Sequence, residues 1–147
     1  MIRRFEKECE ATLDYILPDY LGDIKRVLSA RSKVGSEGMF MLDGGAECAG
    51  NVNIEVIYLD VDGNLCEFNV PCDFSSTFNI DMSAYRTGAV RHKVTQLTHR
   101  VTSARKMSFK SKILSTLECD FSLDAASQFD GAECESESVS VYSSDFL

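Results

Sequence analysis

The sequence predicts a mainly β fold, an antiparallel two-sheet sandwich-like domain with one short N-terminal helix. In several stretches apolar residues alternate with polar ones, which is the period of half-buried strands. Short segments rich in turn-forming residues separate these stretches, and 147 residues suffice to bury one ordinary core. We therefore expect one domain whose strands pair through tight turns.

The clearest hairpin lies within residues 51–71. Both of its arms alternate, and a three-residue loop ending at Gly63 pairs Asp60 with Asn64. Such a loop requires a positive φ at its third position, which glycine supplies. The turn and the hydrophobic pattern thus predict one register, in which Tyr58 faces Cys66, Val56 faces Phe68, and Ile54 faces Val70.

Four elements are expected before this hairpin. A first strand runs from about Glu10 to Ile16, with a short helix as the alternative. After Pro18, apolar residues recur at helical spacing through residues 20–31, and a proline followed by an acid is a typical helix start. Residues 31–42 are interrupted by two glycines, which indicates an irregular or bulged strand. A turn at 43–45 follows.

After the hairpin, residues 74–82 form an extended segment that bends from one sheet to the other, and residues 84–88 form a loop. A second hairpin follows, in which Ser103 pairs with Met107 across a loop of residues 104–106. This register places Leu97 opposite Ile113 and Val101 opposite Phe109, and His99 faces inward as a structural histidine. The solvent face then carries Arg100, Lys110 and Lys112.

Charge is distributed unevenly along the chain, whose net charge is -8. Residues 82–117 contain eight bases and no acids, whereas residues 118–147 contain eight acids and no bases. In one interpretation, the acidic tail only makes the protein more soluble. In the other, the tail is attracted to the basic hairpin of the same chain or of a neighbouring copy, and salt weakens this contact. The candidate interaction surface comprises Arg100, Arg105, Lys106, Lys110 and Lys112.

Three segments are expected: an N-terminal strand or arm (1–16), a β domain (17–121) and an acidic tail or linker (122–147). The tail has too few apolar residues to offset the entropy lost on ordering. Its last ten residues alternate, so they are also a candidate for a strand added to the open edge of a partner.

The chain begins with a charged segment, and no stretch approaches the roughly 18 apolar residues of a membrane span. We expect a soluble, cytoplasmic protein. Its six cysteines are then mostly reduced core residues, and we expect no metal site and no cofactor.

The stretch YLDVDGNL is similar to the first motif of haloacid-dehalogenase-like phosphatases, in which Asp60 would be the nucleophile and Asp62 the acid/base, with Mg²⁺. That chemistry needs an almost wholly apolar parallel strand, whereas positions 53 and 55 are polar. Asn64 also replaces the motif's threonine. A turn is the favoured interpretation, and the phosphatase remains an alternative.

A second alternative is a domain that binds anionic ligands through the basic hairpin. Nucleic acid is not the expected partner, because no aromatic residues interleave with the bases and the acidic tail would compete for them.

Residues 17–119 resemble the SPOCS domain of sporulation proteins, found in SipL-like spore-coat morphogenetic proteins. The resemblance rests on Leu17-Pro18-Asp19 with Asp23-Ile24 and Val27-Leu28-Ser29, on the hairpin 52–70 with Pro71 and Phe74, and on Arg105-Lys106. It implies a non-enzymatic structural and protein-interaction module of the spore envelope, on the mother-cell side. Its partners would be other spore-envelope proteins or copies of itself, with no catalytic residue and no small-molecule substrate.

Overall fold

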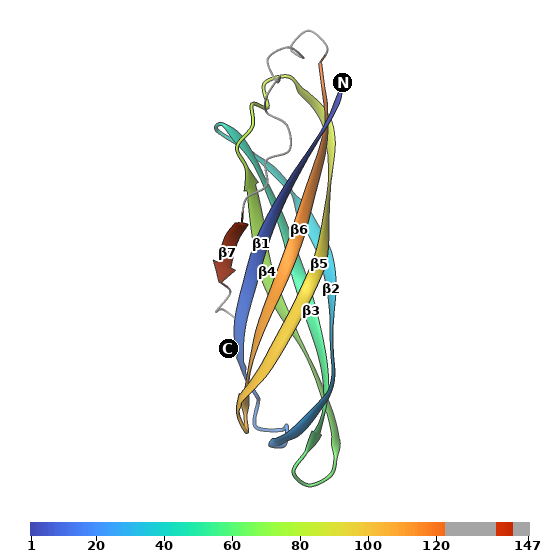
Figure 1. Cartoon of the computed structure of the whole chain (residues 1–147), viewed down its shortest axis with the longest axis vertical. Helices are drawn as coiled ribbons and strands as arrows, with labels where there is room; N and C mark the ends of the chain where they lie inside the picture. Colours follow the sequence, from blue (N-terminus) through green and yellow to red (C-terminus); the bar gives the residue numbers. More distant parts are fainter. Residues whose placement is uncertain (123–137, 143–147) are drawn as a thin grey trace.

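The computed structural model describes residues 1–122 and 138–142. In this part of the chain, strands form two sheets that face each other in one elongated sandwich (Figure 1). Sheet A has the order β5-β6-β1-β7 and sheet B the order β2-β3-β4. Every pairing is antiparallel except that of β1 with β7. The strands are β1 (Ile2–Ile16), β2 (Ile24–Leu42), β3 (Gly45–Asp60), β4 (Leu65–Phe78), β5 (Tyr85–Ser103), β6 (Lys106–Phe121) and β7 (Ser138–Tyr142).

The β3–β4 hairpin has the predicted register. Tyr58 pairs with Cys66, and the pairs further along the hairpin follow in step. The amide of Asp60 donates to the carbonyl of Asn64 at 2.9 Å, and Gly63 has a φ of 85°. Only glycine adopts this conformation without strain, so the loop fixes which faces of the two strands coincide.

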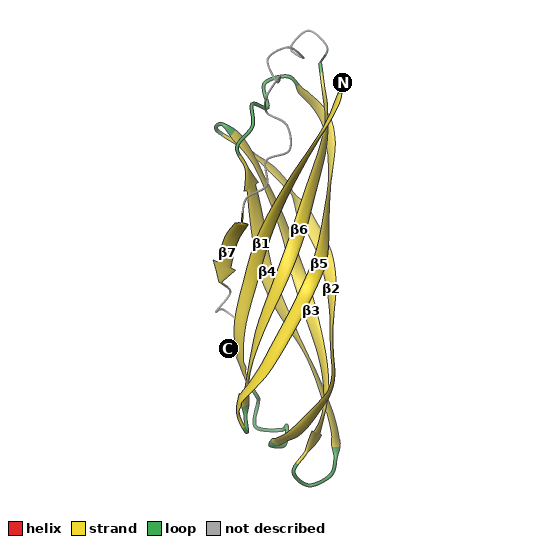
Figure 2. Cartoon of the chain, in the orientation of Figure 1, coloured by secondary structure: helices red, strands yellow, loops and turns green. Residues whose placement is uncertain are grey.

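The predicted N-terminal helix is wrong. Residues 17–23 form a loop, residues 24–42 form β2, and Figure 2 shows only strands and loops in the described chain. Two register shifts, between Ile24 and Arg26 and between Val27 and Ser29, offset the alternation of the strand. Positions 24, 27 and 30 therefore all pack on the core, a spacing of three that imitates a helix.

The first strand is longer than predicted, because it begins at residue 2 instead of residue 10. Its inward positions include Phe5, Cys9, Ala11 and Leu13, all buried. Lys7 occupies an inward position between them, and this charge interrupts the hydrophobic pattern in the sequence. Residues 1–16 are therefore part of the sandwich, with β1 lying between β6 and β7.

Of the other elements, the bulge in residues 31–42 is confirmed by a register shift between Ser36 and Gly38. The bend between the sheets is also confirmed, since residues 79–84 connect β4 of sheet B to β5 of sheet A. The loop predicted at 84–88 is wrong, because β5 already begins at Tyr85.

The second hairpin, β5–β6, forms with a register two residues away from the predicted one. Val101 pairs with Met107, not with Phe109, which pairs with His99. The turn contains only residues 104 and 105, and a register shift follows Val101. A further shift after Val94 changes which residues of β5 share the buried face of β6, so that His92 points inward before the shift. His99 pairs with the buried Phe109 but is itself exposed, so it is not the inward histidine that was predicted. The inward face of β6 is as predicted.

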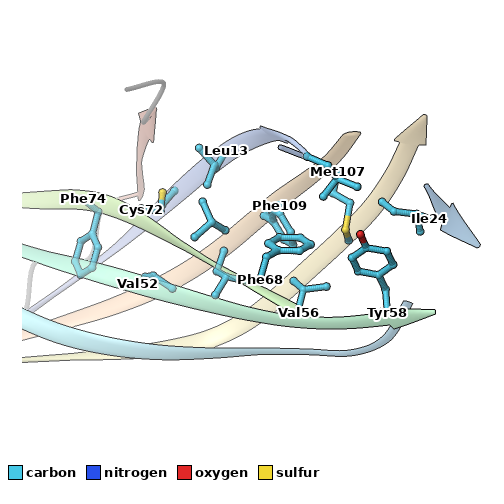
Figure 3. Close-up of a cluster of buried hydrophobic side chains, with 14 of the residues drawn as sticks. Leu13, Ile24, Val52, Val56, Tyr58, Phe68, Cys72, Phe74, Met107 and Phe109 are labelled. Carbon is cyan, nitrogen blue, oxygen red and sulfur yellow. The ribbon is translucent and has the colours of Figure 1, made fainter. Parts of the chain in front are cut away.

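Two hydrophobic clusters fill the space between the sheets. The larger contains residues of both sheets, among them Leu13, Tyr58, Phe68 and Phe109 (Figure 3). Phe68 stacks on Tyr15 with ring centroids 4.8 Å apart and meets Phe109 edge to face. The smaller cluster is built around Phe5, Phe78, Leu117 and Phe121. The buried apolar surface of these clusters is the main force holding the sheets together.

Polar side chains separate the two clusters. Ser115 of β6 pairs in register with Lys7 on one side and with His92 on the other. Its Oγ lies 2.7 Å from Nδ1 of His92 and 3.0 Å from Oγ of Ser76 in the opposite sheet. The Lys7 ammonium donates to the carbonyl of Thr77 on β4. These hydrogen bonds satisfy buried polar groups and fix the two sheets against each other at this level.

Burial lowers the pKa of His92 from its ordinary value of 6.5, and the backbone of Ala49 opposes this only in part. The unfolded chain therefore takes up a proton at a higher pH than the folded chain. Stability should fall as the pH drops below about 6.5, until the pH reaches the lower folded pKa. The measurement is urea unfolding at pH 7.5 and 5.5.

His92→Gln should lose less stability on acidification than the parent chain. His99→Gln is the matched control, since His99 is exposed and the chain has only these two histidines. Equal losses in the His92→Gln variant and the parent would contradict this account of the buried imidazole.

Candidate interaction surface

One side of sheet A carries a groove lined mainly by polar side chains of β1, β5 and β6. Its larger part is a solvent-open hollow of about 430 Å³, and a second hollow of about 150 Å³ shares Thr98 and Lys110 with it. We call both together the basic groove. Its lining residues are Thr12, Gln96, Thr98, His99, Arg100, Ser108, Phe109, Lys110 and Lys112.

Strand alternation explains why these side chains gather. Thr98 pairs with Lys110 and Arg100 pairs with Ser108 across β5–β6, so their side chains project from the same face. Thr12 of β1 pairs with Lys110 on the other side. Every second residue of β6 on the opposite face is buried, including Phe109 and Ser111. The groove is therefore the wet face of a strand whose other face is core.

The cations of the groove differ in how far they are already neutralised. The Lys110 ammonium lies 3.5 Å from the carboxylate of Glu10. Arg100 and Lys112 have no ion-pair partner among the described residues. Arg100 is exposed and Lys112 is partly exposed, so both keep their charge available to an incoming anion. A surface ion pair such as Lys110–Glu10 contributes little stability.

Sheet A is electrically polarised from one edge to the other. The basic groove lies on β5 and β6, whereas β1 turns a row of acids to the solvent on the same face of the sheet: Glu6, Glu8, Glu10 and Asp14. β7, the described part of the acidic tail, pairs with β1. It is thus separated from β5 by β6 and β1.

Arg105 belongs to a structural clamp instead of the groove. Its guanidinium forms an ion pair with Asp23 at 2.7 Å and donates to the carbonyls of Pro18 and Leu21, each at 2.8 Å. The amide of Leu17 donates to the carbonyl of Arg105 at 2.8 Å. These bonds fasten the loop between β1 and β2 to the β5–β6 turn.

Of the five predicted surface residues, the structure therefore brings together Arg100, Lys110 and Lys112. Arg105 points into the clamp, and Lys106 lies at the start of β6, 4.0 Å from the carboxylate of Asp14. The groove also contains four residues that were not predicted from the sequence: Thr12, Gln96, Thr98 and Ser108. The alternation predicts that Ser108 lies beside Lys110, but the pairing of β1 with β6 needed to find Thr12 has no local signal.

Asp60, the residue of the phosphatase alternative, lies at the end of β3 in the middle of an antiparallel sheet and is only 4% exposed. Its Oδ1 accepts hydrogen bonds from the amides of Asn64 at 2.7 Å and Asp62 at 3.0 Å. The Asn64 amide is the main cause of a lowered pKa at Asp60. A Cβ added at Gly22 would lie 2.5 Å from Asp60 Oδ2, so the loop before β2 covers this carboxylate.

Other candidate chemistry is sparse in the described residues. Cys9, Cys48, Cys72 and Cys119 are buried thiols, and Cys66 is half-buried. Burial raises the pKa of Cys48 to about 12 and that of Cys119 to about 11, so both stay protonated and poorly nucleophilic at neutral pH. No group of three or more His, Cys, Asp or Glu side chains in this part of the chain could hold a metal ion.

The described residues contain no helix long and apolar enough to cross a membrane. Comparison with known proteins found no matching family model, no matching curated protein and no matching solved structure.

Replacing Arg105 by alanine should destabilise the fold. The change removes an ion pair and two hydrogen bonds to carbonyls, and it should lower the unfolding free energy by about 2 kcal/mol, since the guanidinium is partly exposed. Urea unfolding measures this loss. Arg100→Ala is the control and should stay within about 0.5 kcal/mol of the parent. Equal effects of the two substitutions would refute the clamp.

Proposed function

We propose that the protein is a non-enzymatic structural module that binds acidic protein segments through the basic groove. The observation that carries this proposal is that Arg100 and Lys112, which have no ion-pair partner in the described part of the chain, share one open groove with the hydroxyl-bearing Thr98. Guanidinium and ammonium groups pair with carboxylates, and flanking hydroxyls hydrogen-bond to them. The flat, wet face of a sheet suits an extended segment better than an enclosed small molecule.

The acidic segment in question is the tail of a neighbouring copy. Residues 118–147 hold eight acids and no base, so the chain carries a ligand of the required charge. The described part of the tail lies on β1, away from the groove, which favours contact between copies over contact within one chain. Such binding would make the module self-associating.

The resemblance to the SPOCS domain supports a setting for this activity in spore-envelope assembly on the mother-cell side. A coat needs modules that join to copies of themselves or to other envelope proteins. An acidic segment of another envelope protein would use the same groove by the same charge complementarity.

The position of Asp60 favours this role over the phosphatase alternative. Its Oδ1 is occupied by backbone amides, the strand that carries it is antiparallel, and a loop covers its other oxygen. A nucleophilic aspartate needs an exposed oxygen at the end of a parallel strand, beside a Mg²⁺ site. Asp60 instead stabilises the β3–β4 turn.

Charge reversal in the groove should weaken binding of a fluorescent peptide with the sequence of residues 124–137, in which serine replaces Cys134. For Arg100→Glu/Lys112→Glu, we expect the Kd from fluorescence anisotropy to rise about tenfold, as two exposed charge pairs are worth roughly 1–2 kcal/mol. The Kd of the parent should also rise with added salt.

Lys25→Glu/Arg26→Glu is the matched control for the groove variant. It makes the same change of net charge on exposed residues of β2 in the other sheet. An equal rise of the Kd in both double variants would mean that net charge alone drives binding, and the groove assignment would fail.

The phosphatase alternative is tested by hydrolysis of p-nitrophenyl phosphate with Mg²⁺. We expect the same background rate for the parent chain and for Asp60→Asn. The variant should nevertheless unfold at a lower urea concentration, because a neutral amide is a weaker acceptor for the turn amides. Hydrolysis that disappears in a folded Asp60→Asn variant would establish an enzyme.

A further inference from the structure

The outer edge of β1 is a second surface of interest, distinct from the basic groove. β6 pairs with β1 along its whole length, but β7 covers only Glu8–Thr12 on the other side. Figure 1 shows β7 beside β1 with the same direction. The edge therefore already accepts a short strand in a defined register, Glu8 with Ser138 through Thr12 with Tyr142.

We propose that this edge is a strand-acceptor site that takes residues 138–142 of a second copy, so that neighbouring molecules exchange β7. The acceptor segment is Glu8–Thr12, and the occupant lies parallel to it. The proposal concerns another surface than the groove and does not depend on the binding of acidic segments proposed above.

The connection to β7 is long enough for exchange. It comprises the fifteen residues 123–137, and a chain of that length reaches at most about 50 Å. β1 itself, with 15 residues, is about 50 Å long. The same segment can thus serve its own β1 or the β1 of an adjacent molecule. Both forms contain the same backbone hydrogen bonds, which is why swapping an identical element is a low-cost route to assembly.

The closed form is weak enough to open. β7 has five residues and a parallel pairing, which is less stable per residue than an antiparallel one. A covalent connection of this length holds β7 near its own β1 at an effective concentration of about a millimolar, so a dense assembly of copies can compete with it. Strand edges of this kind are templates for pairing with other chains.

Side chains of β1 delimit the acceptor segment. Lys7 points inward and donates to the carbonyl of Thr77, which ties β1 to β4 just before the segment starts. Inward-pointing charges are a known protection of strand edges. The acids Glu8 and Glu10 lie within the segment, while residues 138–142 carry no charge and are directly preceded by Glu137. Like charges beside the strand oppose its docking, so added salt should favour it.

Cysteine trapping tests the exchange. In full-length chains with Cys66→Ser and Cys134→Ser, one copy carries Glu10→Cys and another, of different tag mass, carries Ser140→Cys, because positions 10 and 140 pair. The two are mixed and oxidised. We expect a disulfide-linked heterodimer whose yield rises with protein concentration. Glu37→Cys replaces Glu10→Cys in the control, because Glu37 is an exposed acid on β2 of the other sheet, away from both the β1 edge and the basic groove.

A heterodimer yield several-fold above the Glu37→Cys control supports exchange. Yields equal to that control overturn the proposal, as does a result in which only the double variant Glu10→Cys/Ser140→Cys forms a bond, within one chain.

Two further variants separate this proposal from the groove. Val139→Pro/Val141→Pro removes two backbone donors of β7 and should abolish the heterodimer, with Kd of the peptide at the groove unchanged. Replacing Glu133, Glu135 and Glu137 by glutamine should retain the heterodimer. If the glutamine variant loses the heterodimer and the proline variant keeps it, the contact depends on charge, and strand exchange is overturned.

Discussion

The two sheets depend on one constraint: each has a single apolar face, and the two faces must be buried against each other. The long strands maintain this arrangement through a strict alternation of inward and outward side chains, as in β6 from Met107 to Phe121. A sandwich of this length also needs its sheets kept in register. The contact between Ser76 and Ser115 supplies a directional link where apolar packing would permit sliding.

The ends of the sandwich meet a second requirement, since the backbone of the connecting loops must be satisfied. At one end, the amide of Val61 donates to the carbonyl of Asp23, and the Tyr58 hydroxyl donates to the carbonyl of Gly22. Arg105 holds the same loop from the other sheet. Segments that are far apart in sequence thus close this end together, and Asp60 serves as a turn acceptor within it.

Much of the fold is predictable because its signals are local. The β3–β4 register follows from Gly63 and from alternation in two adjacent strands. The wrongly predicted helix in residues 20–31 and the wrongly predicted register of β5–β6 have the same cause. A bulge shifts the alternation of inward and outward side chains along a strand, and no distinctive residue marks it in the sequence. The start of β1 was missed for another reason, because the hydrophobic pattern of the strand is interrupted by the charge of Lys7. Its inward position is tolerable only because Thr77 accepts a hydrogen bond from it across the sheets.

The candidate surface was predictable to the extent that it depends on alternation within one hairpin. Arg100, Lys110 and Lys112 share a face for that reason. Arg105 could not be separated from them, because the loop that uses it lies more than eighty residues earlier. The acids of β1 likewise join the sheet through a pairing of the two ends of the domain, which no short stretch of sequence encodes.

The distribution of these surfaces limits the symmetry of an assembly. The basic groove on β5–β6 and the edge of β1 are different patches, and the occupant proposed for each is a tail segment rather than a second copy of the same patch. A reciprocal exchange between two copies closes a two-fold dimer, whereas donation of the tail in one direction, from each copy to the next, is heterologous and generates rings or open chains. If each molecule both donates its tail and accepts that of the next, growth continues until geometry closes it. A layer that must extend over a surface requires this property, whereas a closed dimer would end growth after one step.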